Sequence, residues 1–260
     1  MSSFKHIILT RYDLAIDVDD GRNLDVGWLD GRRVLFEKYC LPSLMNQSCD
    51  DFVWLMFCDY RTDDAHKRDF ERWQAQCPQM RVVYLPFGDD DFYRSRFSDE
   101  VRLAAADADY VITSRVDSDD ALALDFVRMT QRSAAKTGFA PQIICFPNGQ
   151  QYFERYHTKL NIRYPDNHFI SRVEVGTDVH TVLGFDHRYA ADYGDVRYYC
   201  SDCVMWCQTV HGSNISNDFH RRLRPMPERN SFHDWAVWLM LYARHIIQVV
   251  GRVMRKLFVR

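Results

Sequence analysis

The chain has 260 residues, of which 47% are hydrophobic and 27% are charged. This composition is typical of a globular protein and excludes a disordered chain, a collagen-like repeat and a fibrous coiled coil. The 33 Lys and Arg residues and 36 Asp and Glu residues give a formal net charge of −3. We therefore expect no nucleic-acid partner, because proteins that coat nucleic acids are strongly basic.

Three features of the sequence bear on where the protein resides. The N-terminal region has only the short apolar run 7–9 before Thr10 and Arg11, which does not fit a signal peptide. No stretch of ~18 uncharged apolar residues is present to span a membrane. Eight cysteines are too few for a disulfide scaffold of this length. These features predict a cytoplasmic protein with reduced thiols.

The charge is unevenly distributed along the chain. Residues 220–260 contain nine Lys and Arg against Glu228 and Asp234, a net charge of +7, so residues 1–219 carry −10. An acidic body followed by a basic segment suggests two parts with different tasks. We expect one domain over 1–219 and a basic, amphipathic helical segment over 220–260.

Apolar strand-like segments alternate with helix-like segments over the first half of the chain. In chain order the sequence predicts a strand over 4–10, a helix over 28–41 that Pro42 ends, a strand over 52–58, a helix over 63–76, a strand over 80–87, a helix over 100–108, a strand over 110–116, a helix over 122–136 and a strand over 142–146. Beyond Pro147 the pattern gives irregular strands over 152–164 and 169–175, an aromatic and cysteine-rich segment over 198–217, and one long helix over 232–258.

Apolar strands that alternate with helices predict an α/β fold whose mostly parallel central sheet is covered by helices on both faces. In such sheets, ligands bind beyond the carboxyl ends of the strands. Three of the predicted strands end in polar or charged clusters, over 10–13, 59–61 and 115–120. We expect these three clusters to lie together on one edge of the sheet.

The segment 117–120 reads Asp-Ser-Asp-Asp directly after a predicted buried strand. A single Asp at this place is explained by helix capping. Three carboxylates in four residues repel one another and exceed what a cap requires. Oxygen ligands of this kind suit Mg²⁺ or Mn²⁺, which share their coordination with substrate phosphates. The segment therefore favours a metal site over capping.

Several motifs together resemble a known family. An Asp-x-Asp element at a strand end is similar to the nucleotide-sugar site of GT-A glycosyltransferases, whose fold is Rossmann-like. The wider pattern resembles the family of rhamnosyl transferases. Its motifs are matched here by Leu-Pro-Ser-Leu over 41–44, Gln47, Phe-Val-Trp over 52–54, Asp59, Ser-Arg-Val-Asp-Ser-Asp-Asp-Ala-Leu over 114–122, and the segment from Trp206 through Val-His-Gly to Asn217. The resemblance spans about residues 4–217.

The resemblance implies a divalent metal ion, Mn²⁺ or Mg²⁺, in this segment. It implies that Asp119 binds the ion directly, that Asp117 contacts the ion or the ribose, and that Asp120 supports either one. His211 stands where the family places a histidine that completes the metal shell. Without the family context, a structural histidine in a loop is the better explanation of His211.

The resemblance also implies a nucleotide site. Asp59 would accept a hydrogen bond from N3–H of the base, with Arg61 nearby. Arg11 and Arg115 are candidate diphosphate contacts, because the guanidinium fork matches phosphate geometry. The alternative for both arginines is an ordinary ion pair.

A general base is required if the transfer inverts the anomeric carbon, and it must reach the acceptor hydroxyl. Glu174 and Asp202 are the two candidates. An ordinary salt bridge explains either carboxylate as well.

Two segments near the C-terminus allow other interpretations. Cys200, Cys203, Cys207 and His211 are four soft ligands in one short run, which suggests either a zinc site or one buried face of a helix. The helix predicted over 232–258 carries Trp235 and Trp238 on its apolar face. It is either docked on the domain or bound to an anionic membrane surface.

The sequence thus predicts a metal-dependent glycosyltransferase. Its donor would be a nucleoside-diphosphate sugar, with rhamnose implied by the family, and its acceptor a carbohydrate of a bacterial surface polysaccharide or a lipid-linked glycan. The alternatives are a nucleotidyltransferase and a non-catalytic module that binds zinc or a membrane surface.

Overall fold

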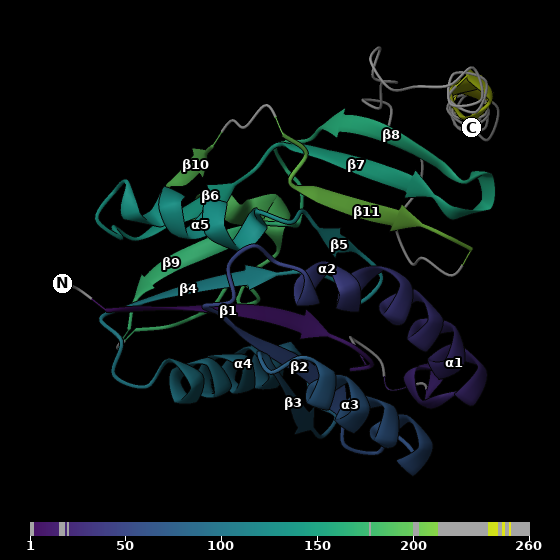
Figure 1. Ribbon diagram of the computed structural model, residues 1–260, viewed down its shortest axis with the longest axis horizontal. Helices are drawn as coiled ribbons and strands as arrows, with labels where there is room; N and C mark the ends of the chain where they lie inside the picture. The colour runs from purple at the N-terminus through teal and green to yellow at the C-terminus, as the bar shows by residue number, and fades with distance from the viewer. Residues whose placement is uncertain are drawn as a thin grey trace, which may run out of the picture.

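Two β-sheets form the framework of the protein (Figure 1). The structure, a computed structural model, describes residues 3–15, 19, 21–176, 178–199, 203–212, 239–243, 246, 247 and 250. The larger sheet has seven strands in the order β10-β6-β9-β4-β1-β2-β3. Their bounds are β1 Phe4–Arg11, β2 Val53–Asp59, β3 Met80–Leu85, β4 Tyr110–Arg115, β6 Gln142–Cys145, β9 Ser171–Val175 and β10 Val196–Tyr198.

Six of these seven strands run in one direction. β1 pairs in parallel with β2 and β4, β2 with β3, and β6 with β10, whereas β9 is antiparallel to both β4 and β6. The α/β class and the mostly parallel central sheet are therefore confirmed, and β9 is the exception that the sequence did not reveal.

The smaller sheet has four strands in the order β5-β11-β7-β8. These are β5 (Ala121–Leu122), β7 (Asn148–Phe153), β8 (Thr158–Arg163) and β11 (Trp206–Val210). The chain passes from β4 of the larger sheet through residues 116–120 into β5 of the smaller one, as Figure 1 shows. The acidic segment is thus the connection between the two sheets.

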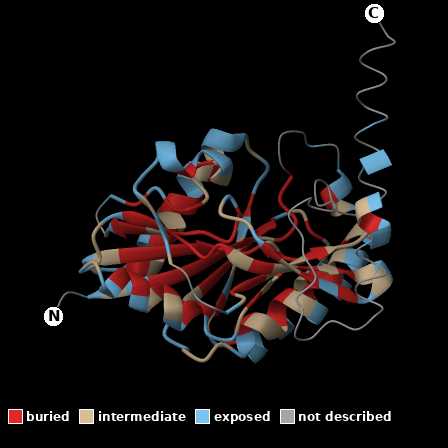
Figure 2. Ribbon diagram, turned by 90° about the horizontal axis from the view of Figure 1, so that it is seen from above, coloured by how far each residue is buried: buried red, intermediate tan, exposed pale blue. Residues whose placement is uncertain are grey.

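The larger sheet is covered on both faces, as expected. On one face Ile8, Trp54 and Met56 pack against a set of helices: α1 (Val26–Leu35), α2 (Leu41–Met45), α3 (Asp64–Gln76) and α5 (Phe126–Ala135). On the other face Ile7 and Leu55 pack against α4 (Asp90–Ala105) and the segment around the short helix η4 (His187–Asp192). Figure 2 shows the buried strands in red between helices whose outer surfaces are pale blue. Burial of these apolar side chains is the main favourable term in folding.

The helices differ most from the predicted ones in two places. Pro42 does not end the first helix, because the five-residue η2 (Phe36–Cys40) joins α1 to α2 and Pro42 lies in the first turn of α2. There the ring is tolerated because a first-turn N–H has no partner within the helix. α4 begins at Asp90, ten residues before the predicted start, after the N-cap Asp89 accepts a hydrogen bond from Phe92 N–H. The other short helices are η1 (Arg22–Leu24) and η3 (Glu154–Tyr156).

The predicted C-terminal helix over 232–258 falls mostly outside the described residues. The described residues 239–243, 246, 247 and 250 are helical, and Leu241 is buried in a core cluster while Ile247 and Val250 are exposed. Trp235 and Trp238 lie outside the described residues. Among the helices that the structure describes, none combines the length and apolarity needed to cross a membrane. The division at residue 219 stays a prediction.

The two sheets are joined by close packing around Trp206. Its ring stacks on Phe169 with a centroid separation of 4.7 Å, and its indole N–H donates to the carbonyl of Phe146 at 2.8 Å. On the neighbouring strand, Gly149 leaves room for the ring, because a Cβ at this position would lie 2.2 Å from Trp206 ring atoms. The smaller sheet therefore depends on a glycine at position 149.

We expect Gly149→Ala to lower the free energy of unfolding by about 1–3 kcal/mol, the usual cost of an overpacked core. Gly31→Ala is the matched control, because a Cβ there meets nothing within 4 Å and the residue lies in α1. It should stabilise the protein by roughly 0.5–1 kcal/mol. Urea denaturation of both variants tests the prediction, and equal stabilities would contradict it.

Candidate active site

The carboxyl ends of the central strands meet at one edge of the larger sheet. Arg11 is paired with Phe57 and Leu9 with Arg115, so that β1, β2 and β4 end at neighbouring positions. Beyond the strand ends, Val116 N–H donates to the carbonyl of Leu9 at 3.2 Å. The three polar clusters are therefore on one edge, as the sequence predicted.

The acidic segment does not cap a helix. α5 begins only at Phe126, and its N-cap is Asp125. Residues 117–120 instead form a turn in which Asp120 N–H donates to the carbonyl of Asp117 at 3.1 Å. The capping alternative for these carboxylates is therefore wrong.

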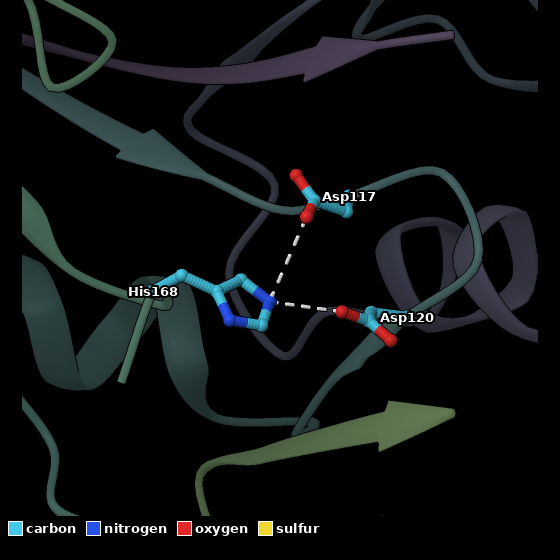
Figure 3. Close-up of side chains that lie close together, drawn as sticks. All are labelled: Asp117, Asp120 and His168. Atoms are coloured by element: carbon cyan, nitrogen blue, oxygen red, sulfur yellow. Dashed lines mark hydrogen bonds and ion pairs between the residues drawn. The ribbon is translucent and has the colours of Figure 1, made fainter. Parts of the chain in front are cut away.

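Asp120 is fully buried and holds together three parts of the chain. Its Oδ1 accepts a hydrogen bond from Thr209 N–H of β11 at 2.7 Å, and its Oδ2 lies 2.9 Å from Nε2 of His168 (Figure 3). Burial raises the pKa of Asp120 well above its usual value, and the neighbouring carboxylates of Asp119 and Asp117 raise it further. Asp120 thus fixes the acidic turn against both sheets.

Asp119 pairs with His211, which follows directly after β11. Nε2 of His211 lies 2.9 Å from Oδ2 of Asp119, and the two side chains are only 4% and 11% exposed. Arg32 of α1 approaches the same oxygen, with Nη1 at 3.4 Å, and also donates to Ser118 Oγ at 3.1 Å. The sequence predicted that Asp119 and His211 belong to the same site, but it did not indicate Arg32.

Asp117 faces Arg115 and His168. Arg115 Nη2 lies 3.1 Å from its Oδ1, and His168 Nε2 lies 3.8 Å from its Oδ2. Desolvation alone would raise the pKa of Asp117, but the charges of Arg115, His168 and Arg11 hold it well below its usual value. Burial is also the main reason that the pKa of His168 falls to about 4. Asp117 is therefore an ionised carboxylate.

The possible metal ligands fall into two sets. Among the described residues, Asp117, Asp120 and His168 form the group of three whose ligand atoms lie within 4.8 Å of one another (Figure 3). Asp119 and His211 form the second set, a pair. The predicted set of Asp117, Asp119 and His211 is thus divided between the two, and His168 is a ligand candidate that the sequence did not indicate.

Asp59, the predicted contact to the nucleotide base, is fully buried. Both of its carboxylate oxygens already accept hydrogen bonds within the protein. Its Oδ1 accepts hydrogen bonds from the backbone N–H and Nε of Arg61, and its Oδ2 accepts from Nη2 of Arg61 and from Asn23. Burial alone would raise the pKa of Asp59, but these hydrogen bonds lower it. Asp59 therefore positions Arg61, which also pairs with Asp19. In this arrangement neither oxygen of Asp59 is left to accept a hydrogen bond from the nucleotide base.

Glu174 lies at the wrong edge of the sheet for a catalytic base. It is paired with Val111 near the start of β4, four residues or about 13 Å before Arg115. Its carboxylate accepts hydrogen bonds from the backbone N–H groups of His180 and Thr181. The antiparallel direction of β9 causes this placement, and we do not retain Glu174 as the base. Asp202 lies outside the described residues.

Glu154 is a carboxylate at the site that the sequence analysis missed. β7 and β11 are parallel with Phe153 opposite Val210, so Glu154 and His211 follow side by side. Oε1 of Glu154 accepts hydrogen bonds from both Lys38 and Tyr39 at 2.9 Å. Partial burial alone would raise its pKa, but these two hydrogen bonds lower it. Only the parallel register brings this residue to the site.

The cysteine-rich run is not a helical stripe. Residues 206–210 form the strand β11, so Cys203 and Cys207 do not share a helix face with His211. Among the residues that the structure describes, Cys203 and Cys207 form no disulfide, and no cysteine belongs to a group of possible metal ligands. Cys200 lies outside the described residues.

Comparison with known proteins identifies the family. A family model described as "Putative rhamnosyl transferase" matches residues 24–222, and the chain belongs to this family. The match covers the acidic segment, the turn that holds Glu154 and the histidine after β11. No curated protein matches the chain.

Solved structures with a related arrangement include TarS of S. aureus. Residues 1–349 of TarS align with a TM-score of 0.46 and 10% identity over 79% of this chain and 60% of TarS. TarS in complex with UDP-GlcNAc gives the same score and identity over 82% of this chain and 60% of TarS. A 4-diphosphocytidyl-2C-methyl-D-erythritol synthase aligns with a TM-score of 0.40 and 12% identity over 76% of this chain and 90% of its own. This chain thus spans less than two thirds of TarS 1–349.

We expect the neighbouring carboxylates Asp120 and Asp119 to differ sharply in their effect on stability. Asp120→Ala leaves Nε2 of His168 and the N–H of Thr209 without their buried partner, and each buried polar group left unsatisfied costs about 1–3 kcal/mol. Asp119→Ala should lower the free energy of unfolding by less, because its loss also relieves repulsion within the turn and Arg32 keeps its contacts with Ser118 and Trp28. Denaturant titrations of the two variants check this difference, and losses of equal size would show that Asp120 has no special structural role.

Proposed function

We propose that the protein transfers a sugar from a nucleoside-diphosphate sugar to a carbohydrate acceptor, with a divalent cation held by Asp119 and His211. The observation that carries the proposal is the 2.9 Å pair of Asp119 Oδ2 and His211 Nε2 at the carboxyl edge of the sheet. Membership of the rhamnosyl transferase family supports rhamnose as the sugar.

The geometry of this pair fits two ligands of one ion. Neighbouring ligands of an octahedral ion at ~2.1 Å are separated by about 3 Å, which agrees with the observed 2.9 Å. The donor set, a carboxylate and an imidazole, suits Mn²⁺ and accommodates Mg²⁺. The remaining positions are then free for phosphate oxygens. Once bound, the cation supplies positive charge to the leaving diphosphate.

Two arginines of the chain are candidates to bind the diphosphate beside that ion. Arg115 is 8% exposed, and its Nε is a buried donor without a partner among the described residues. An unsatisfied buried donor is costly, and a phosphate oxygen would satisfy it. Arg11, at the end of β1, is close enough to Asp117 to lower its pKa. Arg61, half-buried beside Asp59, is the candidate to face the nucleoside.

Glu154 is our candidate for the general base in place of Glu174, and Asp202 stays an untested alternative. Among the described residues both hydrogen bonds to Glu154 go to Oε1, so Oε2 is available for an acceptor hydroxyl. The lowered pKa keeps the carboxylate ionised at neutral pH. In an inverting transfer, Oε2 takes the hydroxyl proton as the acceptor oxygen bonds to the anomeric carbon. The bond to the diphosphate breaks, and its electron pair leaves with the phosphate.

The acceptor and the place of action remain as predicted from the sequence. We propose a carbohydrate of a surface polysaccharide or a lipid-linked glycan as the acceptor. Attachment of the basic segment over 232–260 to a membrane surface would bring the enzyme to such a lipid-linked acceptor.

We expect Asp119→Ala to abolish the Mn²⁺-dependent binding of a nucleoside diphosphate and to lower sugar transfer on the order of 100-fold or more, as loss of one charge-stabilising group does. His211→Ala should weaken metal binding less, because the negatively charged ligand Asp119 remains. Asp107→Ala, an exposed carboxylate away from the site, is the control. Isothermal titration calorimetry with a panel of nucleotide sugars and analysis of the released product check this prediction.

The outcomes of this experiment are distinct. Release of a nucleoside diphosphate identifies glycosyl transfer, whereas release of pyrophosphate would identify a nucleotidyltransferase. Unchanged transfer by folded Asp119→Ala protein would contradict the proposed metal site.

A second variant tests the proposed base. Glu154→Gln keeps an oxygen that accepts from Lys38 and Tyr39 but cannot take a proton, so sugar transfer should fall about 100-fold or more. Nucleoside-diphosphate affinity should be unchanged, because the substitution acts on the acceptor side. Glu71→Gln, on the exposed face of α3, is the control. A normal rate for Glu154→Gln would remove Glu154 from the mechanism.

A further inference from the structure

Arg32 lies beside the proposed metal pair of Asp119 and His211. It lies on α1, its side chain is only 14% exposed, and its Nη1 is 3.4 Å from Asp119 Oδ2. The same nitrogen donates to Ser118 Oγ at 3.1 Å. The guanidinium lies 4.8 Å from the ring centroid of Trp28, one turn earlier on α1. Arg32 is thus held in the site by three different contacts.

Arg32 and a metal ion require the same oxygen. His211 Nε2 and Arg32 Nη1 both approach Oδ2 of Asp119, at 2.9 and 3.4 Å. An ion bound to this oxygen at ~2.1 Å would stand close to the guanidinium, and the two positive charges would repel each other. The arginine therefore has to leave Asp119, at least in part, when the ion binds.

The diphosphate of the donor offers the guanidinium a new partner at the same place. A phosphate bound to the ion brings negative oxygens next to Asp119, and the planar arginine fork pairs well with such oxygens. Trp28 would keep the guanidinium near this position after it releases Asp119, because the ring face attracts a cation. The arginine then moves by a short distance between two anions.

We propose that Arg32 is the counter-ion of Asp119 in the ligand-free site and exchanges Asp119 for the donor diphosphate when the metal binds. This inference rests on the proposed function. Because metal binding breaks the Arg32–Asp119 pair and diphosphate binding provides a new one, each ligand strengthens the binding of the other. By linkage the two effects are equal in size.

The substitution Arg32→Gln should change the two affinities in opposite directions. Without nucleotide, Mn²⁺ should bind more tightly than to the wild type, because the competing cation is absent. At saturating Mn²⁺, the nucleoside diphosphate should bind more weakly, because a phosphate partner is lost. The factor by which each ligand strengthens the other, about 5-fold or more in the wild type, should fall, and the coupling that remains is the direct contact between the ion and the phosphate.

The measurement uses the full chain and calorimetry. Mn²⁺ is titrated alone, and then UDP, dTDP, GDP, CDP and ADP are titrated with and without Mn²⁺ to find the one that the wild type binds most tightly. That nucleotide is used for all variants. Arg33→Gln is the matched control, because it removes the same charge from the same helix. Arg33 pairs with Asp30 and Asp69 and not with Asp119. It should shift neither affinity appreciably.

Arg32→Lys separates charge from geometry and replaces Arg32→Gln if that variant does not fold. The lysine keeps the competition with Mn²⁺ but loses the fork, so Mn²⁺ affinity should stay near the wild-type value while diphosphate affinity falls. If Arg32→Gln weakens both ligands, or changes neither, the exchange is overturned while the proposed function stands. If the wild type binds neither Mn²⁺ nor any of the nucleotides, the proposed function itself fails.

Discussion

The carboxylate of Asp120 joins segments that are 48 and 89 residues away in the chain. It accepts a hydrogen bond from the N–H of Thr209 in the smaller sheet. It also contacts the imidazole of His168, which lies in the connection that leads into β9. A buried carboxylate is stable only when its hydrogen bonds are complete, so these contacts hold their segments in one arrangement. His211 lies two residues beyond Thr209, and Asp119 directly precedes Asp120. The position of the Asp119–His211 pair therefore follows from the contacts of Asp120.

Each of the three carboxyl groups in the acidic turn has its own partners. Asp117 has Arg115, Asp119 has Arg32 and His211, and Asp120 has His168. Each carboxylate consequently has a different task. Asp120, without exposure to solvent, serves the fold, whereas Asp119 is at the surface of the site with partners that a metal ion and a phosphate are able to replace. In the proposed function, this division lets one four-residue turn combine rigidity with ligand binding.

The sequence predicted the parts of the fold that depend on local pattern. The apolar strands β1, β2 and β4 and their shared carboxyl edge follow from hydrophobic runs bounded by polar clusters. The smaller sheet was less visible, because β7 buries Gly149 and Gln151 in alternate positions where the pattern expects apolar side chains. The direction of β9 has no local signal at all, and Glu174 was misassigned for that reason. Arg32, Glu154 and His168 reach the site through pairings distant in sequence, which no spacing rule in a single chain reveals.

Anomalous X-ray diffraction from crystals of the protein with Mn²⁺ and the bound nucleoside diphosphate tests the central claim most directly. The account predicts one manganese peak within about 2.2 Å of both Asp119 Oδ2 and His211 Nε2, with phosphate oxygens completing its shell. A peak coordinated instead by Asp117, Asp120 and His168, or a bound nucleotide with no manganese peak beside Asp119, would contradict it.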